Sequence, residues 1–368
     1  MNRRLRLGVT ATGVAFVIAI MLGATGALGP AGQAAASGAS TLTILSGSVL
    51  VRHAGGDFGS AADGAVLAAG DTIKTGADAR AVLTYFEGST VEMEPDSELT
   101  IDAARSDPNG DTIIVMQQDL GVTWNVVTHL ITTGSMYEIH TSTATASVRG
   151  TQFTVAVAPD GTTTQTTTEG AVADTDAQGT TTVVTPPGYQ TTTRKGEAPT
   201  PPVRVTAPDR TVTVTVADED ALVVDTLGRA NGLKDGKKVL QTPGAHLTVV
   251  DGHLVVTLPN VPDGALTTHL ASGNSATDVT TRVEDHGEPA VEVKDTVAPG
   301  TNSGVDIAKG AGAVPTLKKC ADSSDAPAPK VGRAPILSSR SSDFVSQLTV
   351  PVPYVGASLT SESRQNTR

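Results

Sequence analysis

Short segments in which apolar and polar residues alternate recur along most of this chain, and they limit its possible folds more than any other feature. Successive side chains of a β-strand point to opposite faces, so a period of two predicts strands with one buried face. Clear cases are Val91–Glu94, Tyr137–His140, Phe153–Val157 and Val212–Val216. Turn-forming residues, chiefly Gly beside Asp, Asn or Pro, recur every 8 to 12 residues, roughly the spacing that is typical of all-β domains. The chain is therefore predicted to be all-β.

The alternating segments form two groups. Residues 41–195 are expected to be one β-solenoid or sandwich domain, and residues 203–293 a small antiparallel β-sandwich. Between them, residues 196–202 end in Pro-Thr-Pro-Pro and predict an extended linker. Residues 294–368 are rich in Pro, Ser and Ala without periodicity, and we expect a disordered tail.

The first 40 residues indicate a targeting segment. Arg3, Arg4 and Arg6 precede an uncharged stretch over residues 7–29, which predicts one apolar helix. Uncleaved, this helix would be a signal anchor in the membrane, with the rest of the chain outside the cytoplasm. Residues 33–37 also offer a cleavage site for a signal peptide. Both alternatives predict an extracytoplasmic protein, either anchored by a single pass or secreted.

The charge balance argues against nucleic-acid binding. The chain has 26 Lys and Arg against 38 Asp and Glu, a formal net charge of −12 at pH 7, whereas such binding requires a basic surface that displaces counterions from phosphates. Cys320 is the only cysteine, which excludes an internal disulfide framework and a Cys-based zinc site. A single cysteine also suits an exported protein.

Two stretches of the first group resemble the FecR domain. One is Gly-Asp-Thr-Ile-Lys-Thr-Gly at residues 70–76, followed by a segment that ends in Glu-Gly-Ser at 87–89. The other is Val-Arg-Gly-Thr-Gln-Phe at 148–153, followed by Glu-Gly-Ala-Val at 169–172. The resemblance covers about residues 41–195 and rests on Gly70, Asp71, Thr75, Gly76, Gly88, Ser89, Arg149, Gly150, Thr151, Phe153, Glu169 and Gly170. It implies an extracytoplasmic all-β module that binds or signals, without catalysis and without a cofactor.

The motif residues are expected to be structural. The glycines of the motif are expected to supply backbone angles that other residues resist. Arg149 is expected to form a fork with a carboxylate such as Glu169 or Glu138 and so to pin neighbouring strands, the alternative being an anion-binding arginine.

The resemblance fails at the front of the chain. FecR proteins that regulate iron uptake carry a helical sigma-factor-binding domain on the cytoplasmic side, whereas six residues precede the apolar stretch here. Direct anti-sigma activity is therefore not expected. The second group is similar to β-sandwich modules of bacterial surface proteins, through an Asp-x-x-Gly-Arg turn at 225–229 and a Pro-Gly-Ala turn at 243–245.

One loop has part of the residue spacing of a calcium site. Asp107, Asn109 and Asp111 have the first spacings of a calcium loop, but the sixth position is Thr112 and the twelfth is Gln118. A calcium loop requires Gly and Glu there, so we expect a polar hairpin tip.

One pair of carboxylates has a spacing that bears on catalysis. Glu92 and Glu94 share one face of a strand, and such a pair suits a glycosidase only inside a cleft. We expect instead an exposed acidic stripe on an enzymatically inactive protein.

Two functions remain open. The first is a non-enzymatic extracytoplasmic FecR-domain protein without a cytoplasmic anti-sigma domain, which binds or senses an envelope protein or a polysaccharide. Residues 7–29 would hold it in the membrane if uncleaved. The alternative is a structural or adhesive protein, surface-bound or secreted, whose β modules act as a spacer.

Overall fold

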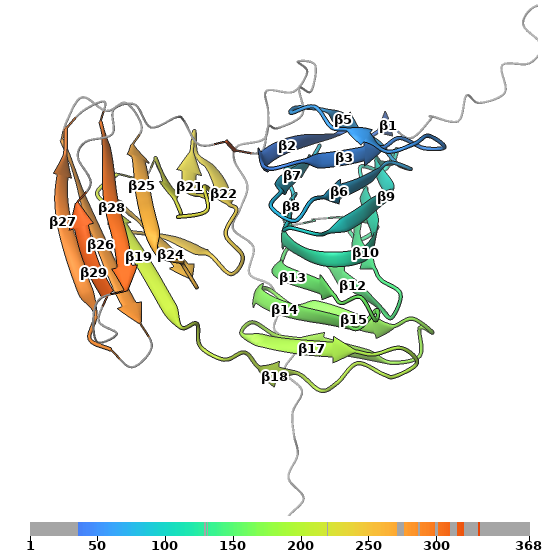
Figure 1. The fold of residues 1–368 in the computed structure, drawn as a ribbon. Coiled ribbons are helices and arrows are strands. Elements are labelled where there is room, and N and C mark those ends of the chain that lie inside the picture. Colours follow the sequence, from blue (N-terminus) through green and yellow to red (C-terminus); the bar gives the residue numbers. More distant parts are fainter. Residues whose placement is uncertain are drawn as a thin grey trace, which may run out of the picture. The chain divides into compact units, whose positions relative to one another are not determined.

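The computed structural model describes residues 36–128, 130, 132–218, 220–270, 276–285, 288–298, 301–309, 315–319 and 330–331. The apolar helix expected over residues 7–29 lies outside these residues, as do Cys320 and most of the expected tail. Every regular element in the described part is a β-strand, as the alternation predicts (Figure 1). None of the described segments forms a helix long and apolar enough to span a membrane.

The first β domain consists of two facing sheets, A and B. In sheet A the order is β4 (Gly59–Ser60), β3 (Val49–Arg52), β6 (Thr72–Thr75), β9 (Glu98–Ser106), β10 (Thr112–Val126), β11 (Met136–His140), β12 (Ala144–Val148), β15 (Val172–Asp176) and β16 (Thr182–Thr185), and β1 (Ala36–Ser37) also pairs with β9. In sheet B the order is β5 (Val66–Leu67), β2 (Ser40–Ser46), β7 (Arg80–Tyr85), β8 (Thr90–Met93), β10, β13 (Gln152–Val157), β14 (Thr163–Glu169), β17 (Tyr189–Thr193) and β18 (Val203–Arg204). Neighbouring strands are antiparallel except β10 and β11, which run parallel.

Strand β10 joins the two sheets. Its first part pairs with β9 in sheet A, and from Gly121 onward it pairs with β8 and β13 in sheet B. Gly121 lies at the change with a φ of 84°, and a Cβ atom there would stand 2.5 Å from the Cα atom of Ser97. Glycine is therefore required where the strand passes from one sheet to the other.

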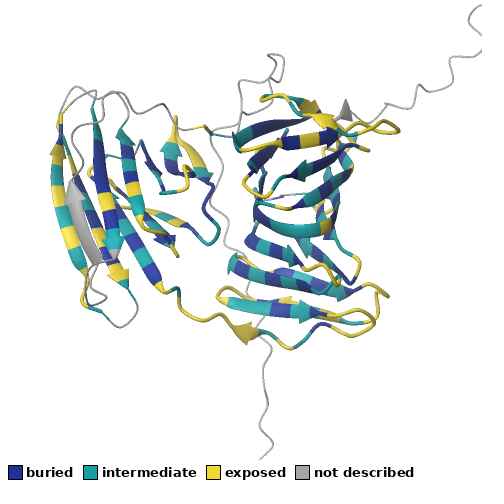
Figure 2. Cartoon of the chain, viewed as in Figure 1, coloured by how far each residue is buried: buried dark blue, intermediate teal, exposed yellow. Residues whose placement is uncertain are grey.

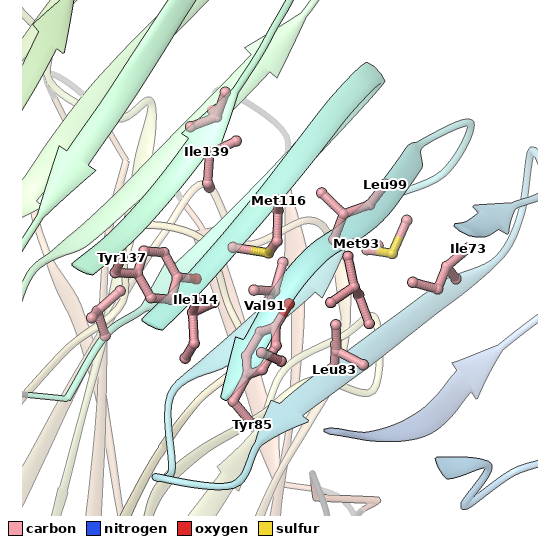
Figure 3. Packing of buried hydrophobic residues seen from close by; sticks show 14 of the residues in the cluster. Ile73, Leu83, Tyr85, Val91, Met93, Leu99, Ile114, Met116, Tyr137 and Ile139 are labelled. Carbon is pink, nitrogen blue, oxygen red and sulfur yellow. The ribbon is translucent and has the colours of Figure 1, made fainter. Parts of the chain in front are cut away.

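The inward faces of the two sheets enclose an apolar core. Figure 2 shows the buried and exposed positions alternating along these strands. Figure 3 shows residues of β7 to β11 packed together, among them Leu83, Met93, Ile114 and Tyr137. Tyr137 of sheet A also meets Phe153 of sheet B edge to face, with ring centroids 6.4 Å apart. Aromatic contacts of this kind stabilise the pairing of two sheets.

The second β domain is an antiparallel sandwich, as its alternation predicts. One sheet has the order β23 (His246–Val250), β24 (His253–Pro259), β19 (Arg210–Val216), β26 (Thr277–Asp285) and β27 (Val291–Val297). The other has the order β22 (Lys237–Leu240), β21 (Ala230–Lys234), β20 (Ala221–Val224), β25 (Gly264–Leu270), β28 (Asn302–Lys309) and β29 (Pro315–Lys319).

Two of the domain boundaries expected from the sequence are wrong. Strand β18 begins at residue 203 but pairs with β17, so it belongs to the first domain. Strands β28 and β29 lie beyond residue 293 but complete a sheet of the sandwich. Val305 and Ile307 of β28 are buried while Asp306 between them is exposed, so their apolar burial holds the strand in place.

Side chains of the second domain cover part of the outer face of sheet B. The indole Nε1 of Trp124 donates to the carbonyl oxygen of Leu240 at 3.0 Å, and Val126 packs against the apolar core of the sandwich. The guanidinium of Arg229 reaches Glu94 at 2.9 Å. As a result, Glu92 is only 2% exposed, which corrects the expectation of an exposed acidic stripe.

Candidate functional site

Three turns that carry residues of the FecR-like motif meet at one edge of the first domain. Gly88-Ser89 connects β7 to β8, residues 149–151 connect β12 to β13, and Glu169-Gly170 ends β14 before β15. The last two turns pass between the sheets, because β12 and β15 lie in sheet A and β13 and β14 in sheet B.

These turns hold the segment that leads from β10 to β11. The Oγ of Ser89, which is fully buried, accepts from the main-chain N–H of Thr128 at 2.9 Å. The N–H of Val127 donates to the carbonyl oxygen of Thr151 at 3.0 Å, and the N–H of Leu130 donates to that of Arg149 at 3.1 Å. The motif therefore fixes the path of this segment through main-chain hydrogen bonds.

Arg149 does not have the partner that the sequence predicts. Its Nη1 and Nη2 donate to the carbonyl oxygens of Thr132 and Thr133 at 3.3 and 2.8 Å, so the fork closes on main chain instead of a carboxylate. Glu169 instead accepts from Gln152 and lies 3.4 Å from Nζ of Lys238. The planar guanidinium has several N–H donors, so it can donate to two carbonyl oxygens at once and tie Arg149 to the main chain of 132–133.

The glycines of the two sheet-changing turns lie against each other. Gly150 has a φ of 136° and Gly170 a φ of 79°, both of which disfavour other residues. The Oγ1 of Thr151, only 3% exposed, donates to the carbonyl oxygen of Ala171 at 3.2 Å, which ties the two turns together. Phe153, the last motif residue, is fully buried in the core.

The other motif residues lie elsewhere in the domain. The carboxylate of Asp71, which follows Gly70 with its φ of 93°, accepts from the main-chain N–H of Ala68 at 3.0 Å and so closes a turn. The Oγ1 of Thr75 donates to the carbonyl oxygen of Glu94 at 2.7 Å. The main-chain N–H of Gly76 donates to the carbonyl oxygen of Ser48 at 3.0 Å. These residues fasten loops, and the structure does not bring them to the edge that Arg149 occupies.

The segment that the motif holds forms one wall of a depression on the outer face of sheet A, which we call the hollow. Its volume is about 480 Å³, within the usual range for binding pockets. Residues Glu138, Ser147, Ala173 and Val184 lie side by side across β11, β12, β15 and β16. Because the two middle residues are small, the sheet surface sinks between larger neighbours.

The rim of the hollow combines apolar and charged side chains. Met136 and Val184 are 40% and 59% exposed, and both line the hollow. The carboxylate of Glu138 accepts from the Oγ of Ser147 at 3.0 Å and lies 2.9 Å from Nε2 of His140. Arg149 adds a positive charge to the same lining. The hollow therefore combines exposed apolar side chains with charges of both signs.

Comparison with known proteins identifies the first domain. Residues 71–173 match the family model described as FecR protein. This segment is a FecR domain. It contains all twelve motif residues except Gly70, which lies one residue before the match. The expectation drawn from the two sequence stretches is confirmed.

The FecR match covers only part of the chain, and other similarities are remote. No curated protein matches this chain. Two crystal structures of one protein, a candidate anti-sigma factor from Parabacteroides distasonis ATCC 8503 solved at 2.50 and 1.65 Å, are similar at 16% identity with a TM-score of 0.29. The similarity covers 34% of this chain and 56% of that protein, so the chain spans about half of its length.

The remaining candidate residues of the FecR domain have other roles. The Oδ1 of Asp107 accepts from the main-chain N–H groups of Asn109 and Asp111, at 2.8 and 2.9 Å, and so shapes a hairpin tip. Glu94 bridges Arg80 and Arg229 at 2.8 and 2.9 Å. Among the described residues, no group of three or more His, Cys, Asp or Glu side chains is arranged to hold a metal ion.

Sequence reasoning missed most of the hollow. Of its residues the sequence indicates only Arg149 and Glu138, the latter as one of two candidate carboxylate partners for Arg149. Ala173 and Val184 belong to Thr- and Ala-rich strands in which nothing marks a binding position. A usable signal is the outward position of Val184 in β16, since alternation places its side chain on the face opposite to that of the buried Thr185.

Proposed function

We propose that this protein is a non-enzymatic, extracytoplasmic FecR-domain protein that binds or senses a partner at the cell envelope, and that the hollow is where the partner docks. The observation that carries the proposal is that Arg149, a residue of the FecR motif, holds the segment that forms the hollow's wall. The motif thus supports a surface for recognition, in keeping with a family that binds or signals.

The chemistry of the hollow favours recognition over catalysis. The side chains of Glu138 and Arg149 both form hydrogen bonds with other protein atoms. These bonds orient the two groups and mark neither as a general acid or base. The exposed Met136 and Val184 supply apolar area that a partner would bury. We favour an envelope protein as partner over a polysaccharide, because sugars are commonly held by exposed aromatic rings and Tyr137 in this lining is buried.

Site-specific crosslinking in cells tests the proposal. A photo-reactive residue is placed at Met136 or Val184, and as a control at Val66, which is 64% exposed in the same domain but away from the hollow. We expect one crosslinked envelope protein from the first two positions only. Ala173→Arg, which fills the hollow, should abolish the crosslink. Thr175→Arg, at the next outward position of β15, should leave the crosslink intact.

The alternative function gives a different result. If the β modules serve only as a spacer, no position yields a specific product, or all three yield the same products. Either result would contradict docking at the hollow.

Location is tested separately by labelling. Asn109→Cys is placed at the exposed hairpin tip in a Cys320→Ser background, and spheroplasts are treated with a membrane-impermeant maleimide. An extracytoplasmic domain is labelled in intact spheroplasts. Labelling that requires lysis would contradict this location. Fractionation and N-terminal sequencing then decide between an anchor through residues 7–29 and a cleaved signal peptide.

A further inference from the structure

The interior of the FecR domain changes character towards β14, β15, β16 and β17. The apolar core includes Val172 of β15 but no residue of β14, β16 or β17. The other buried side chains of these four strands are polar: Thr163, Gln165, Thr167, Asp174, Asp176, Thr185, Thr191 and Thr193. Hydrogen bonds therefore replace apolar burial in holding these strands, which makes this end easier to open locally.

Two carboxyl groups belong to this layer, Asp174 and Asp176, and Asp174 is the one that is poorly stabilised as an anion. Only 2% of the residue is exposed, and its Oδ2 accepts from the Oγ1 of Thr185 at 2.8 Å. Asp176, two residues along the same strand, accepts instead from the main-chain N–H groups of Thr180 and Thr181 and from the Thr180 hydroxyl. Burial raises the pKa of Asp174 to about 7, whereas these donors lower the pKa of Asp176.

The side chains of the surrounding strands do not supply a compensating charge. Ala146 of β12 and Val183 of β16 are its cross-strand neighbours on sheet A. The interior side chains of β14 and β17 are the uncharged threonines and glutamine named above. The nearest carboxyl group along β15 is Asp176, which has the same sign. An ionised Asp174 is thus left with one hydroxyl donor, and water becomes the better environment.

Strand β16 links Asp174 to the hollow. Thr185 points inward to Asp174, while Val184, the preceding residue, points outward and lines the hollow. Strand β16 is four residues long and, in the described part of sheet A, is the outer strand beside β15. Any movement that gives Asp174 access to water through this edge also removes Val184 from the rim.

We propose that a proton on Asp174 controls the hollow: protonated Asp174 keeps β16 docked and the hollow formed, and ionisation releases β16 and dismantles the wall that Val184 provides. The release of β16 does not depend on the proposed function, and only its effect on binding rests on that function. The ordinary pKa of an aspartate is near 3.8, so the docked strand is most stable below this pH. Its stability then falls as the pH rises to about 7 and changes little above.

Hydrogen exchange of the full chain tests the release of β16. In the wild type, the protection of the β16 amides, corrected for intrinsic exchange, should fall about tenfold per pH unit between pH 5.5 and 7. In Asp174→Asn, which cannot ionise, protection should stay constant over this range. Asp176→Asn is the matched acid-to-amide control and should keep the pH dependence of the wild type. Equal profiles for the wild type and Asp174→Asn would overturn the proposal.

Crosslinking from Met136 at pH 6 and pH 8 separates this proposal from the proposed function. With both correct, the wild type crosslinks more at pH 6, and Asp174→Asn crosslinks equally at both. If exchange shows the release of β16 while no position crosslinks at any pH, the control of β16 stands and docking at the hollow is wrong. If crosslinking is specific but the β16 amides do not respond to pH, docking stands and proton control is wrong.

Discussion

Gly170 lies so close to Gly150 that a Cβ atom on Gly170 would stand 2.7 Å from the carbonyl oxygen of Gly150. The two residues are at the turns that carry the chain between sheets A and B, and both have positive φ values. Main chain meeting main chain leaves no side chain that could move aside. The turns of the second half of the FecR motif are therefore coupled by a contact that glycine alone permits.

Gly170→Ala should consequently destabilise the domain more than its backbone angle alone predicts. We expect a loss of about 3 kcal/mol in the free energy of unfolding, from the left-handed backbone together with the clash. Gly179→Ala is the control, because Gly179 has a φ of 70° but open space around its Cβ position, and about 1 kcal/mol is expected. Urea denaturation measures both. Equal losses would show that the contact with Gly150 is not a constraint.

Local patterns in the sequence predicted the strands well, because each strand buries one face and so records its orientation in its own residues. The alternation at Phe153–Val157 and Val212–Val216 is confirmed residue by residue. The method fails where an apolar pattern is short. In β28 only Val305 and Ile307 mark the buried face, beside Gly304 and polar neighbours, so the sequence predicts a disordered tail there.

Contacts between distant residues were not predictable in the same way. The outward orientation of Glu92 follows from alternation, but its burial depends on the second domain, which no local pattern reveals. Likewise, Arg149 has carbonyl partners in the segment before β11, and main-chain acceptors leave no trace in the sequence. The hollow was missed for the same reason, since it depends on small residues of separate strands meeting side by side.

The fork of Arg149 leads to a prediction about the hollow's wall. In Arg149→Lys the single ammonium cannot reproduce the planar fork onto the carbonyls of Thr132 and Thr133. Hydrogen exchange of the described amides in 132–136 should rise several-fold with little change in global stability, because the side chain is exposed. Arg105→Lys, at an exposed position of β9, is the matched control and should leave these amides unchanged. Unchanged exchange in Arg149→Lys would show that the fork does not hold the wall.

Buried Glu92 makes stability depend on pH. Burial raises the pKa of Glu92 well above its ordinary 4.5, and neither carboxylate oxygen has a hydrogen-bond partner in the described structure. A raised pKa in the folded state means that its stability is complete at low pH and is lost as the pH rises above about 4.5. Glu92→Gln should therefore stabilise the protein by about 1 kcal/mol or more at pH 7.5 relative to the wild type, with a smaller gain at pH 4.5.

The neighbouring Glu94 provides a control for which the opposite change in stability is expected. Glu94→Gln weakens the ion pairs with Arg80 and Arg229 and should lower the free energy of unfolding at pH 7.5 by about 2 kcal/mol. Urea titrations at the two pH values measure both variants. A Glu92→Gln variant that is less stable than the wild type at pH 7.5 would mean that Glu92 is a stabilising anion after all.

Trp124 is the only tryptophan, so its fluorescence reports directly on the contact with the second domain. Its indole is 1% exposed and donates to Leu240, so the folded wild type should emit at short wavelength and resist quenching by acrylamide. Arg229→Gln, which weakens the neighbouring pairing with Glu94, should shift the emission to the red and increase quenching. Lys294→Gln removes a charge whose side chain is 76% exposed, and it should behave as the wild type. A wild-type tryptophan quenched as readily as in the urea-unfolded chain would refute the covering of sheet B by the sandwich, and with it the burial that sets the pKa of Glu92.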